Sequence, residues 1–202
     1  MTTPPTPPAT VGDRLAGFAP PVTPPVFTTA EVAYAVSDTP IGRILLACND
    51  SGALVASAFV ADGVVEEGFV ERLGRVVSPR VLRLPGALDE PRRQLDDFLA
   101  GRRRGFDLPL ALALTTPFQQ TVLTTLAARV PYGSRSTYGA LAAAIERPSA
   151  ARAVGTALGA NPLCVVLPCH RVLGASGALT GYAGGVAAKR YLLDLEAAHT
   201  AG

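Results

Sequence analysis

The sequence has 202 residues, of which 49% are hydrophobic and 17% charged, a composition typical of a globular protein with a substantial core. No run reaches the roughly 18 apolar residues of a membrane helix, and the N-terminus lacks a charged segment followed by an apolar one, so we expect a cytoplasmic protein. The net charge is +2, but residues 116–202 hold 7 Lys and Arg against 3 acidic residues, whereas residues 1–115 hold 11 against 13. A positive second half is compatible with nucleic-acid contact.

The sequence contains three cysteines, Cys48, Cys164 and Cys169, at spacings typical of neither a disulfide framework nor a metal site. An odd number of cysteines indicates a reducing compartment and at least one free thiol. The histidines are also few, since only His170 and His199 are present. A zinc site would have to use the reactive cysteine described below, so we predict that the protein binds no metal.

Residues 1–28 contain eight prolines among threonines and alanines, and pairs such as Pro4-Pro5 and Pro20-Pro21 are incompatible with helices and sheet ladders. We expect a disordered arm over 1–28, with a polyproline ligand for another domain as the alternative. A first folded domain is expected over 29–107, because short apolar runs alternate with turn residues from Glu31 onward.

In this first domain the apolar runs predict an antiparallel meander followed by two helices. Strands are expected over 32–36, 42–48 and 53–60, and helices over 64–75 and 86–100. Cys48 falls inside a strand and is interpreted as a small core residue. Arg102, Arg103 and Arg104 form a basic turn that is either a phosphate-binding patch or a solvated surface, and we favour the surface.

A second domain is expected over 116–202, after an apolar extended linker at 108–115. Thr116 and Pro117 are typical of a helix start, with the hydroxyl as cap and proline in the first turn. Two further short helices, 138–145 and 149–159, predict a helix-turn-helix. The second of them has small side chains and one arginine, Arg152, a pattern that fits close approach to the DNA minor groove.

A strand-like apolar run over 161–168 ends at Pro168, and Cys169 and His170 follow at once. A thiol reacts as its thiolate, and a free cysteine with a pKa near ~8.5 is mostly protonated at neutral pH. A neighbouring group that accepts the proton is therefore the first requirement for a reactive thiol. Because a Cys-His pair also occurs by chance, the surrounding residues decide the interpretation.

Three stretches, Asn161-Pro162, Pro168-Cys169-His170-Arg171-Val172 and the glycine-rich 180–185, resemble the active-site region of the O6-alkylguanine-DNA alkyltransferases, also called methylated-DNA-protein-cysteine methyltransferases. The resemblance runs from about residue 33 to 196. It implies an α/β N-terminal domain of ribonuclease-H-like type, then a mostly α C-terminal domain with a winged helix-turn-helix-like DNA-binding motif. It also implies DNA repair by irreversible, single-turnover transfer of an alkyl group from O6-alkylguanine, with O4-alkylthymine as an open second substrate.

The resemblance also implies roles for individual residues. Cys169 is the acceptor, His170 takes its proton through a water, and Glu196 orients and charges the imidazole. Tyr138 protonates the departing base, Lys189 lies near O6, and Asn161 ties the active-site turn to the recognition helix. The implied DNA-binding residues are Ser149, Ala151, Arg152, Ala153, Gly155 and Tyr138, with Arg152 replacing the extruded nucleotide. The implied pocket residues are Pro168, Val172, Tyr182, Ala183 and Gly184.

The sequence departs from the family pattern at Leu123 and Tyr191, where tryptophan is usual, and at Ala183, where serine is common. No cofactor is implied, because the alkyl group comes from the substrate. The expected partner is double-stranded DNA containing O6-alkylguanine, bound by a monomer. A non-catalytic lesion-binding protein, a helix-turn-helix regulator of the same fold and a Cys-His hydrolase remain as alternatives.

Overall fold

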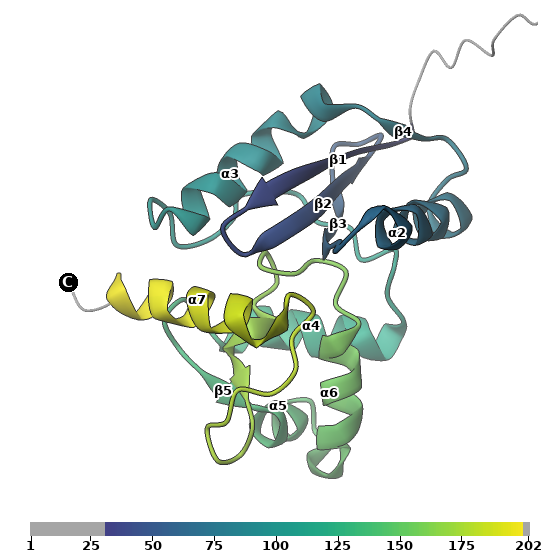
Figure 1. The fold of residues 1–202 in the computed structure, drawn as a ribbon. Coiled ribbons are helices and arrows are strands. Elements are labelled where there is room, and N and C mark those ends of the chain that lie inside the picture. The colour runs from purple at the N-terminus through teal and green to yellow at the C-terminus, as the bar shows by residue number, and fades with distance from the viewer. Residues whose placement is uncertain (1–30, 200–202) are drawn as a thin grey trace, which may run out of the picture.

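The structure, a computed structural model, describes residues 31–199. The predicted arm over 1–28 lies outside these residues. Two parts follow one another along the described chain, a sheet with two helices and then a mostly helical part that lies against it (Figure 1). This order confirms the predicted fold class.

The first part is built on a four-stranded sheet. Its strands are β1 (Val32–Thr39), β2 (Gly42–Asn49), β3 (Leu54–Phe59) and β4 (Val81–Arg83), in the order β3-β2-β1-β4. Strands β1, β2 and β3 pair antiparallel, which confirms the predicted meander. Strand β4 pairs parallel with β1 and was not predicted, because three residues are too short to show an alternating pattern.

Alternating side chains on β2 bury the two faces of the sheet under different helices. Leu45 and Ala47 pack with Leu73 of α2 (Gly63–Val76), whereas Leu46 packs with Phe98 of α3 (Asp89–Leu99) in the other cluster. Because strand residues point alternately to opposite faces, the sheet lies between the two helices (Figure 1). Cys48 is a core residue, as predicted, and burial raises its pKa to about 11.

The second part starts at Thr116, whose side chain accepts a hydrogen bond from Gln119 N while the Gln119 side chain caps Thr116 N in return. Its elements are α4 (Pro117–Arg129), β5 (Ser136–Thr137), α5 (Tyr138–Ala144), α6 (Ala151–Gly159), β6 (Val172–Leu173) and α7 (Gly185–Ala198). Helices α5 and α6 form the predicted helix-turn-helix, joined through a 3-10 turn at Pro148–Ala150. Strands β5 and β6 pair parallel beside it.

The apolar run over 161–168 is not the strand that its composition suggested. It is a buried turn in which Leu167 N donates to Leu163 O at 2.8 Å, and Val165 has a left-handed backbone with φ 71°. A β-branched residue in that region carries strain, and the packing of the surrounding chain has to hold it there. The run is apolar because both parts of the protein enclose it, a cause that periodicity does not reveal.

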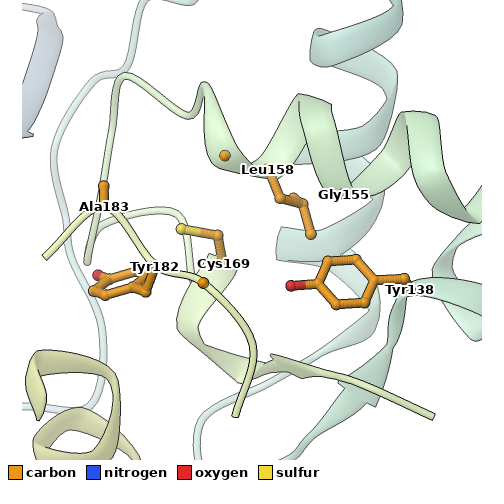
Figure 2. Close-up of a pocket in the computed structure, with 8 residues that line it drawn as sticks. Tyr138, Gly155, Leu158, Cys169, Tyr182 and Ala183 are labelled. Carbon is orange, nitrogen blue, oxygen red and sulfur yellow. The ribbon is translucent and has the colours of Figure 1, made fainter. Parts of the chain in front are cut away.

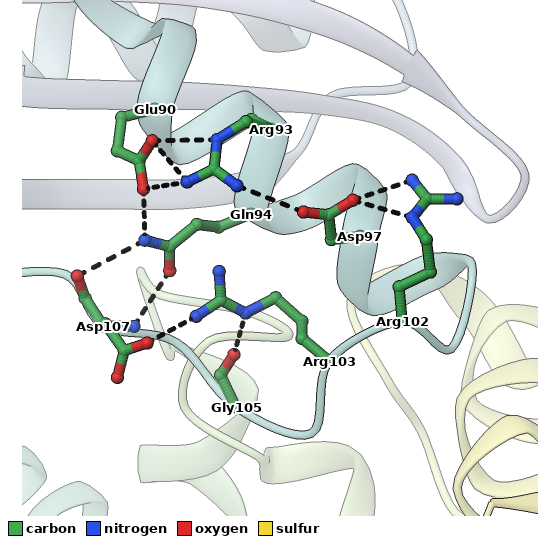
Figure 3. A network of polar contacts seen from close by, with 8 residues as sticks. All are labelled: Glu90, Arg93, Gln94, Asp97, Arg102, Arg103, Gly105 and Asp107. Atoms are coloured by element: carbon green, nitrogen blue, oxygen red, sulfur yellow. Dashed lines mark hydrogen bonds and ion pairs between the residues drawn. The ribbon is translucent and has the colours of Figure 1, made fainter.

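The basic turn at 102–104 is paired within the chain. Arg102 binds Asp97, and Arg103 binds Asp107 (Figure 3). Arg104 donates to His199 O at 2.6 Å. Arg93 bridges Asp97 and Glu90 in the same network. These pairs support the interpretation as a solvated surface rather than a phosphate patch.

The segment at 108–115, predicted as an extended linker, pairs with the first residue of β3. Leu54 N donates to Pro109 O at 2.8 Å, and Ala111 N donates to Leu54 O at 3.0 Å. Leu114 is buried in the same core cluster as Leu73. None of the helices within 31–199 has the length and apolar character needed to cross a membrane. The same residues contain no group of three or more His, Cys, Asp or Glu side chains that could hold a metal ion.

Candidate active site

Cys169 is the first residue of the 3-10 turn Cys169–Arg171, and its side chain borders a cavity of about 220 Å³. Cys169 is 6% exposed, so the residue is largely shielded from solvent. Figure 2 shows Tyr138 and Tyr182 approaching the cavity from different segments, with Cys169 between them. The lining residues are Tyr138, Gly155, Leu158, Gly159, Cys169, Gly181, Tyr182 and Ala183.

Asn161 connects the reactive cysteine to the turn before it. Its Nδ2 donates to Cys169 Sγ at 3.2 Å and to Leu167 O at 3.1 Å, and its Oδ1 accepts from Leu163 N at 2.9 Å. Asn161 is the second residue after the end of α6, so one buried amide links the end of this helix, the turn and the sulfur. An amide N–H that points at sulfur favours the thiolate form.

A second buried thiol, Cys164, lies beside the first. Cys164 Sγ donates to Asn161 O at 3.4 Å. The neighbouring Cys164 thiol is the main cause that lowers the pKa of Cys169, with further contributions from the Asn161 amide and the charge of Lys189 against the effect of burial. The pKa of Cys164 is raised well above its ordinary value by the neighbouring Cys169 thiol and by burial. The pair therefore ionises at Cys169.

His170 is fully buried and is held by Glu196, whose Oε1 lies 2.9 Å from His170 Nε2. A carboxylate only accepts hydrogen bonds, so Nε2 carries the proton and Nδ1 is the basic nitrogen. No protein group among the described residues is hydrogen-bonded to Nδ1. Burial lowers the pKa of His170 more than Glu196 raises it, so the imidazole is neutral at neutral pH. Glu196 contacts His170 as expected, and its hydrogen bond and charge raise the pKa of the imidazole, but the effect of burial is larger.

Arg171 adds to the effect of burial, because its positive charge also lowers the pKa of His170. Its Nη2 lies 2.8 Å from Glu196 Oε1 and its Nε 3.0 Å from both carboxylate oxygens, so the guanidinium neutralises the carboxylate. Burial alone would raise the pKa of Glu196, but hydrogen bonds from His170 and Arg171 bring it below its ordinary value. Sequence reasoning missed this role of Arg171. The signal was its place inside the motif, directly after His170.

Two other predicted residues are hydrogen-bonded within the site. The Tyr138 hydroxyl lies 2.7 Å from Thr180 Oγ1, a partner that the sequence did not reveal. Lys189 is 1% exposed and donates to Val172 O at 2.6 Å. Burial lowers the pKa of Lys189, although the neighbouring Cys169 thiolate raises it. The Val172 carbonyl is therefore already occupied by Lys189.

The glycine-rich loop closes the cavity against the sheet. Tyr182 makes an edge-on contact with Phe59 of β3, at a ring-centroid distance of 5.5 Å, and lies 6.3 Å from the His170 ring. A Cβ on Gly184 would lie 2.5 Å from the Phe59 ring, so only glycine fits there. Ala183 lines the cavity, whereas Pro168 is buried outside it.

The predicted DNA-binding residues lie along α6 and the turn before it. Ser149, Arg152 and Ala153 are exposed, and Ala151 is half-buried. Gly155 lines the cavity, where its Cα faces the Tyr138 ring (Figure 2). The cavity therefore opens beside the exposed helix that carries Arg152. At the two departures from tryptophan, Leu123 is fully buried in the core, whereas Tyr191 is exposed and its hydroxyl donates to Leu99 O at 3.0 Å.

Comparison with known proteins places both parts of the chain in one family. Residues 32–112 match the family model for the 6-O-methylguanine DNA methyltransferase ribonuclease-like domain, and residues 117–198 match that for its DNA-binding domain. The chain is 39% identical to the methylated-DNA--protein-cysteine methyltransferase of Methanosarcina acetivorans over 165 residues, which cover 81% of this chain and 97% of that protein. The corresponding protein of Mycolicibacterium paratuberculosis is 40% identical over 169 residues, covering 84% and 94%.

A solved structure shows the same arrangement in three dimensions. The crystal structure of Mycobacterium tuberculosis OGT in complex with DNA superposes with a TM-score of 0.70 at 38% sequence identity, covering 83% of this chain and 94% of that one. Both halves of the sequence, their order and their fold therefore agree with the relatives. The chain belongs to the 6-O-methylguanine DNA methyltransferase family.

Proposed function

We propose that this protein repairs DNA by transferring an alkyl group, methyl above all, from O6 of guanine to Cys169 Sγ. One buried thiol with a lowered pKa at the cavity wall is the observation that carries the proposal. The relatives are named for the same reaction. The sulfur–carbon bond has no route back in this site, so each molecule reacts once.

The transfer begins with loss of the Cys169 proton. The neutral His170 accepts it at Nδ1 through a water molecule, and Glu196 holds the imidazole by the bond at Nε2. The thiolate then attacks the alkyl carbon in line with the C–O6 bond. A sulfur–carbon bond forms, the C–O6 bond breaks, and its electron pair remains on the guanine oxygen.

The departing guanine carries negative charge, which hydrogen-bond donors around the cavity stabilise. Tyr138 is the donor on the cavity wall, and its bond to Thr180 orients the hydroxyl. The buried ammonium of Lys189 adds positive charge near the sulfur and the leaving base.

The cavity accepts a base only after the nucleotide leaves the stacked duplex. Helix α6 is the element that enters the minor groove, and Arg152 fills the space of the extruded nucleotide. The positive charge of residues 116–202 supports binding to the phosphate backbone. A reducing cytoplasm fits three free cysteines.

Incubation with a duplex containing O6-methylguanine, followed by intact-protein mass measurement, tests the proposal. We expect a stoichiometric mass gain of one methylene unit in the wild type and in Cys48→Ser, and none in Cys169→Ser. The tryptic peptide 153–171 contains both Cys164 and Cys169, so fragmentation between Leu167 and Pro168 must assign the adduct. Binding without a mass gain would favour a lesion-binding protein or a regulator, and repeated turnover would favour a hydrolase.

A further inference from the structure

The loop at 181–184 lies between two cavities. Its first three residues line the active-site cavity of about 220 Å³. A second cavity, of about 320 Å³, is lined by Ala183 and Gly184 of the loop together with Phe59 and other residues of the N-terminal part. Ala183 borders both cavities, so the loop is a thin wall between the substrate space and a second open space beside the sheet.

Phe59 of β3 contacts this loop at two places. Its ring makes the edge-on contact with Tyr182, at a ring-centroid distance of 5.5 Å. The ring also lies against Gly184, where a Cβ would come within 2.5 Å of it. Gly184 has a φ of −84°, which does not require glycine, so the Phe59 ring excludes a side chain at this position. The ring therefore sets how closely the loop approaches the sheet.

Phe59 is itself held by the sheet. It is the last residue of β3 and lies opposite Ile44 of β2. The next residue, Val60, donates its backbone N–H to Arg43 O at 3.0 Å. A side chain on a paired strand is positioned more rigidly than one on a loop, so Phe59 gives the loop a fixed support.

We infer that Phe59 is a positioning residue that holds the loop at 181–184 and thereby limits the width of the substrate cavity, which makes it a determinant of alkyl-group size. The inference rests on the proposed function and deepens it, because it concerns the substrate of the same site. Without the ring, the loop gains space on the side of the second cavity. A wider active-site cavity orients a methylated base less well and accommodates a larger O6 substituent better.

The ratio of benzyl to methyl transfer therefore reports the position of the loop. Phe59→Ala should raise this ratio roughly two- to tenfold, the effect expected for loss of one aromatic contact. Gly184→Ala should lower the ratio, because its methyl group meets the Phe59 ring and pushes the loop into the active-site cavity. In the double variant the ring is absent, so Gly184→Ala should have little effect in the Phe59→Ala background.

The experiment measures single-turnover transfer to Cys169 from two duplexes of one sequence, carrying O6-methylguanine or O6-benzylguanine. Because both duplexes require binding and nucleotide extrusion, the ratio of the two rates isolates the fit of the alkyl group. Phe59→Leu keeps part of the apolar bulk and should give an intermediate ratio even if Phe59→Ala folds poorly, which urea unfolding reports. The control is Phe69→Ala, which removes a half-buried ring of α2 from the other core cluster and should leave the ratio unchanged.

A second measurement reads the width of the cavity without alkyl transfer. Cys169 is alkylated with iodoacetamide or with the bulkier N-benzylmaleimide, and peptide mass spectrometry gives the rate of each reaction at this residue. The ratio of the bulky to the small reagent should rise roughly two- to tenfold in Phe59→Ala and fall in Gly184→Ala, for the same reason as the ratio of the two lesions.

The two measurements separate this inference from the proposed function. Reagent ratios that change as expected, without transfer from either duplex in the wild type, would support the role of Phe59 and contradict the alkyl-transfer function. Transfer by the wild type with equal ratios in wild type and Phe59→Ala would overturn the role of Phe59 alone. An equal effect of Gly184→Ala in both backgrounds would also overturn it, because the loop would then not be positioned by the ring.

Discussion

Ser57 of β3 and Cys164 of the turn before the nucleophile bind each other in both directions. Cys164 N donates to Ser57 O at 2.7 Å, and Ser57 Oγ donates to Cys164 O at 2.8 Å. Ser57 N adds a bond of 2.7 Å to Pro162 O. The N-terminal sheet thus extends by a short segment of the C-terminal part, five residues before Cys169. These hydrogen bonds attach the sheet to the turn that leads to Cys169.

Replacing the Ser57 side chain should loosen this connection. Ser57→Ala leaves the Cys164 carbonyl buried with one donor fewer, which should cost about 1–3 kcal/mol of the free energy of unfolding. The rate of benzyl transfer should fall too, because the turn that holds Cys169 becomes less ordered. Urea unfolding and single-turnover kinetics measure the two effects. The control is Ser176→Ala, at an exposed serine; equal behaviour of both variants would show that the backbone bonds suffice.

Arg152→Ala should impair transfer from duplex DNA far more than transfer from free O6-benzylguanine, because the free base needs no extrusion. The loss on duplex should be on the order of the few kcal/mol that unstacking a nucleotide costs. Single-turnover rates on both substrates measure it. Arg129→Ala, which removes another exposed arginine at the end of α4, is the matched control. Equal losses on the two substrates would mean that Arg152 supports the fold instead.

Glu196→Gln should destabilise the protein by about 3–5 kcal/mol, because it leaves the buried Arg171 guanidinium without its counter-charge. The pKa of Glu196 is lowered in the folded state, so its contribution is present above the ordinary carboxylate pKa of about 4.3 and is lost as pH falls through the folded-state value.

Urea unfolding at pH 7 and in acid measures both parts of this prediction. The difference between wild type and Glu196→Gln should shrink in acid, where the wild-type carboxylate is protonated. Asp194→Asn removes an exposed carboxylate from the same helix and should change little at either pH. An equal difference in the free energy of unfolding between wild type and Glu196→Gln at both pH values would contradict the titration of Glu196.

Alkylation of Cys169 should lower the melting temperature. The sulfur is buried against the Asn161 amide, so an added group either crowds that contact or displaces it, at a cost of about 1–3 kcal/mol. Benzyl should lower the melting temperature more than methyl. Thermal unfolding of the unmodified, methylated and benzylated protein measures the series, with treated Cys169→Ser as the control. Identical melting of all three forms would show that the site has room and that Asn161 does not sense the adduct.

The parts of the fold that were predicted correctly are those where local chemistry decides. The alternation on β2 and the Thr116 cap depend on neighbouring residues, so periodicity and side-chain type are sufficient evidence. The turn over 161–168 was misread as a strand because its apolar residues are buried by two distant elements. Only the three-dimensional contacts with β3 explain why a backbone with Val165 at φ 71° is retained.

The same limit applies to the site. His170 and Glu196 were paired through the family resemblance, and the structure brings them together across 26 positions of sequence. The contacts of Thr180 and Arg171 in the site were not predicted, because the tertiary fold determines their partners. Cys164 was assigned to a strand-like run, whereas the observed turn lets its thiol donate to Asn161 O at 3.4 Å.

The attachment of the 162–164 segment to β3 also determines the order in which the two parts of the site form during synthesis. Domains fold largely from the N-terminus as the chain emerges, so the edge of β3 is formed before residues 161–170 leave the ribosome. Until this edge receives the turn, Asn161 has no fixed position from which to stabilise a thiolate. A nascent chain therefore carries an ordinary cysteine at position 169, and its reactivity appears only when both halves have docked. Docking of the two halves is therefore the step that makes the Cys169 sulfur reactive.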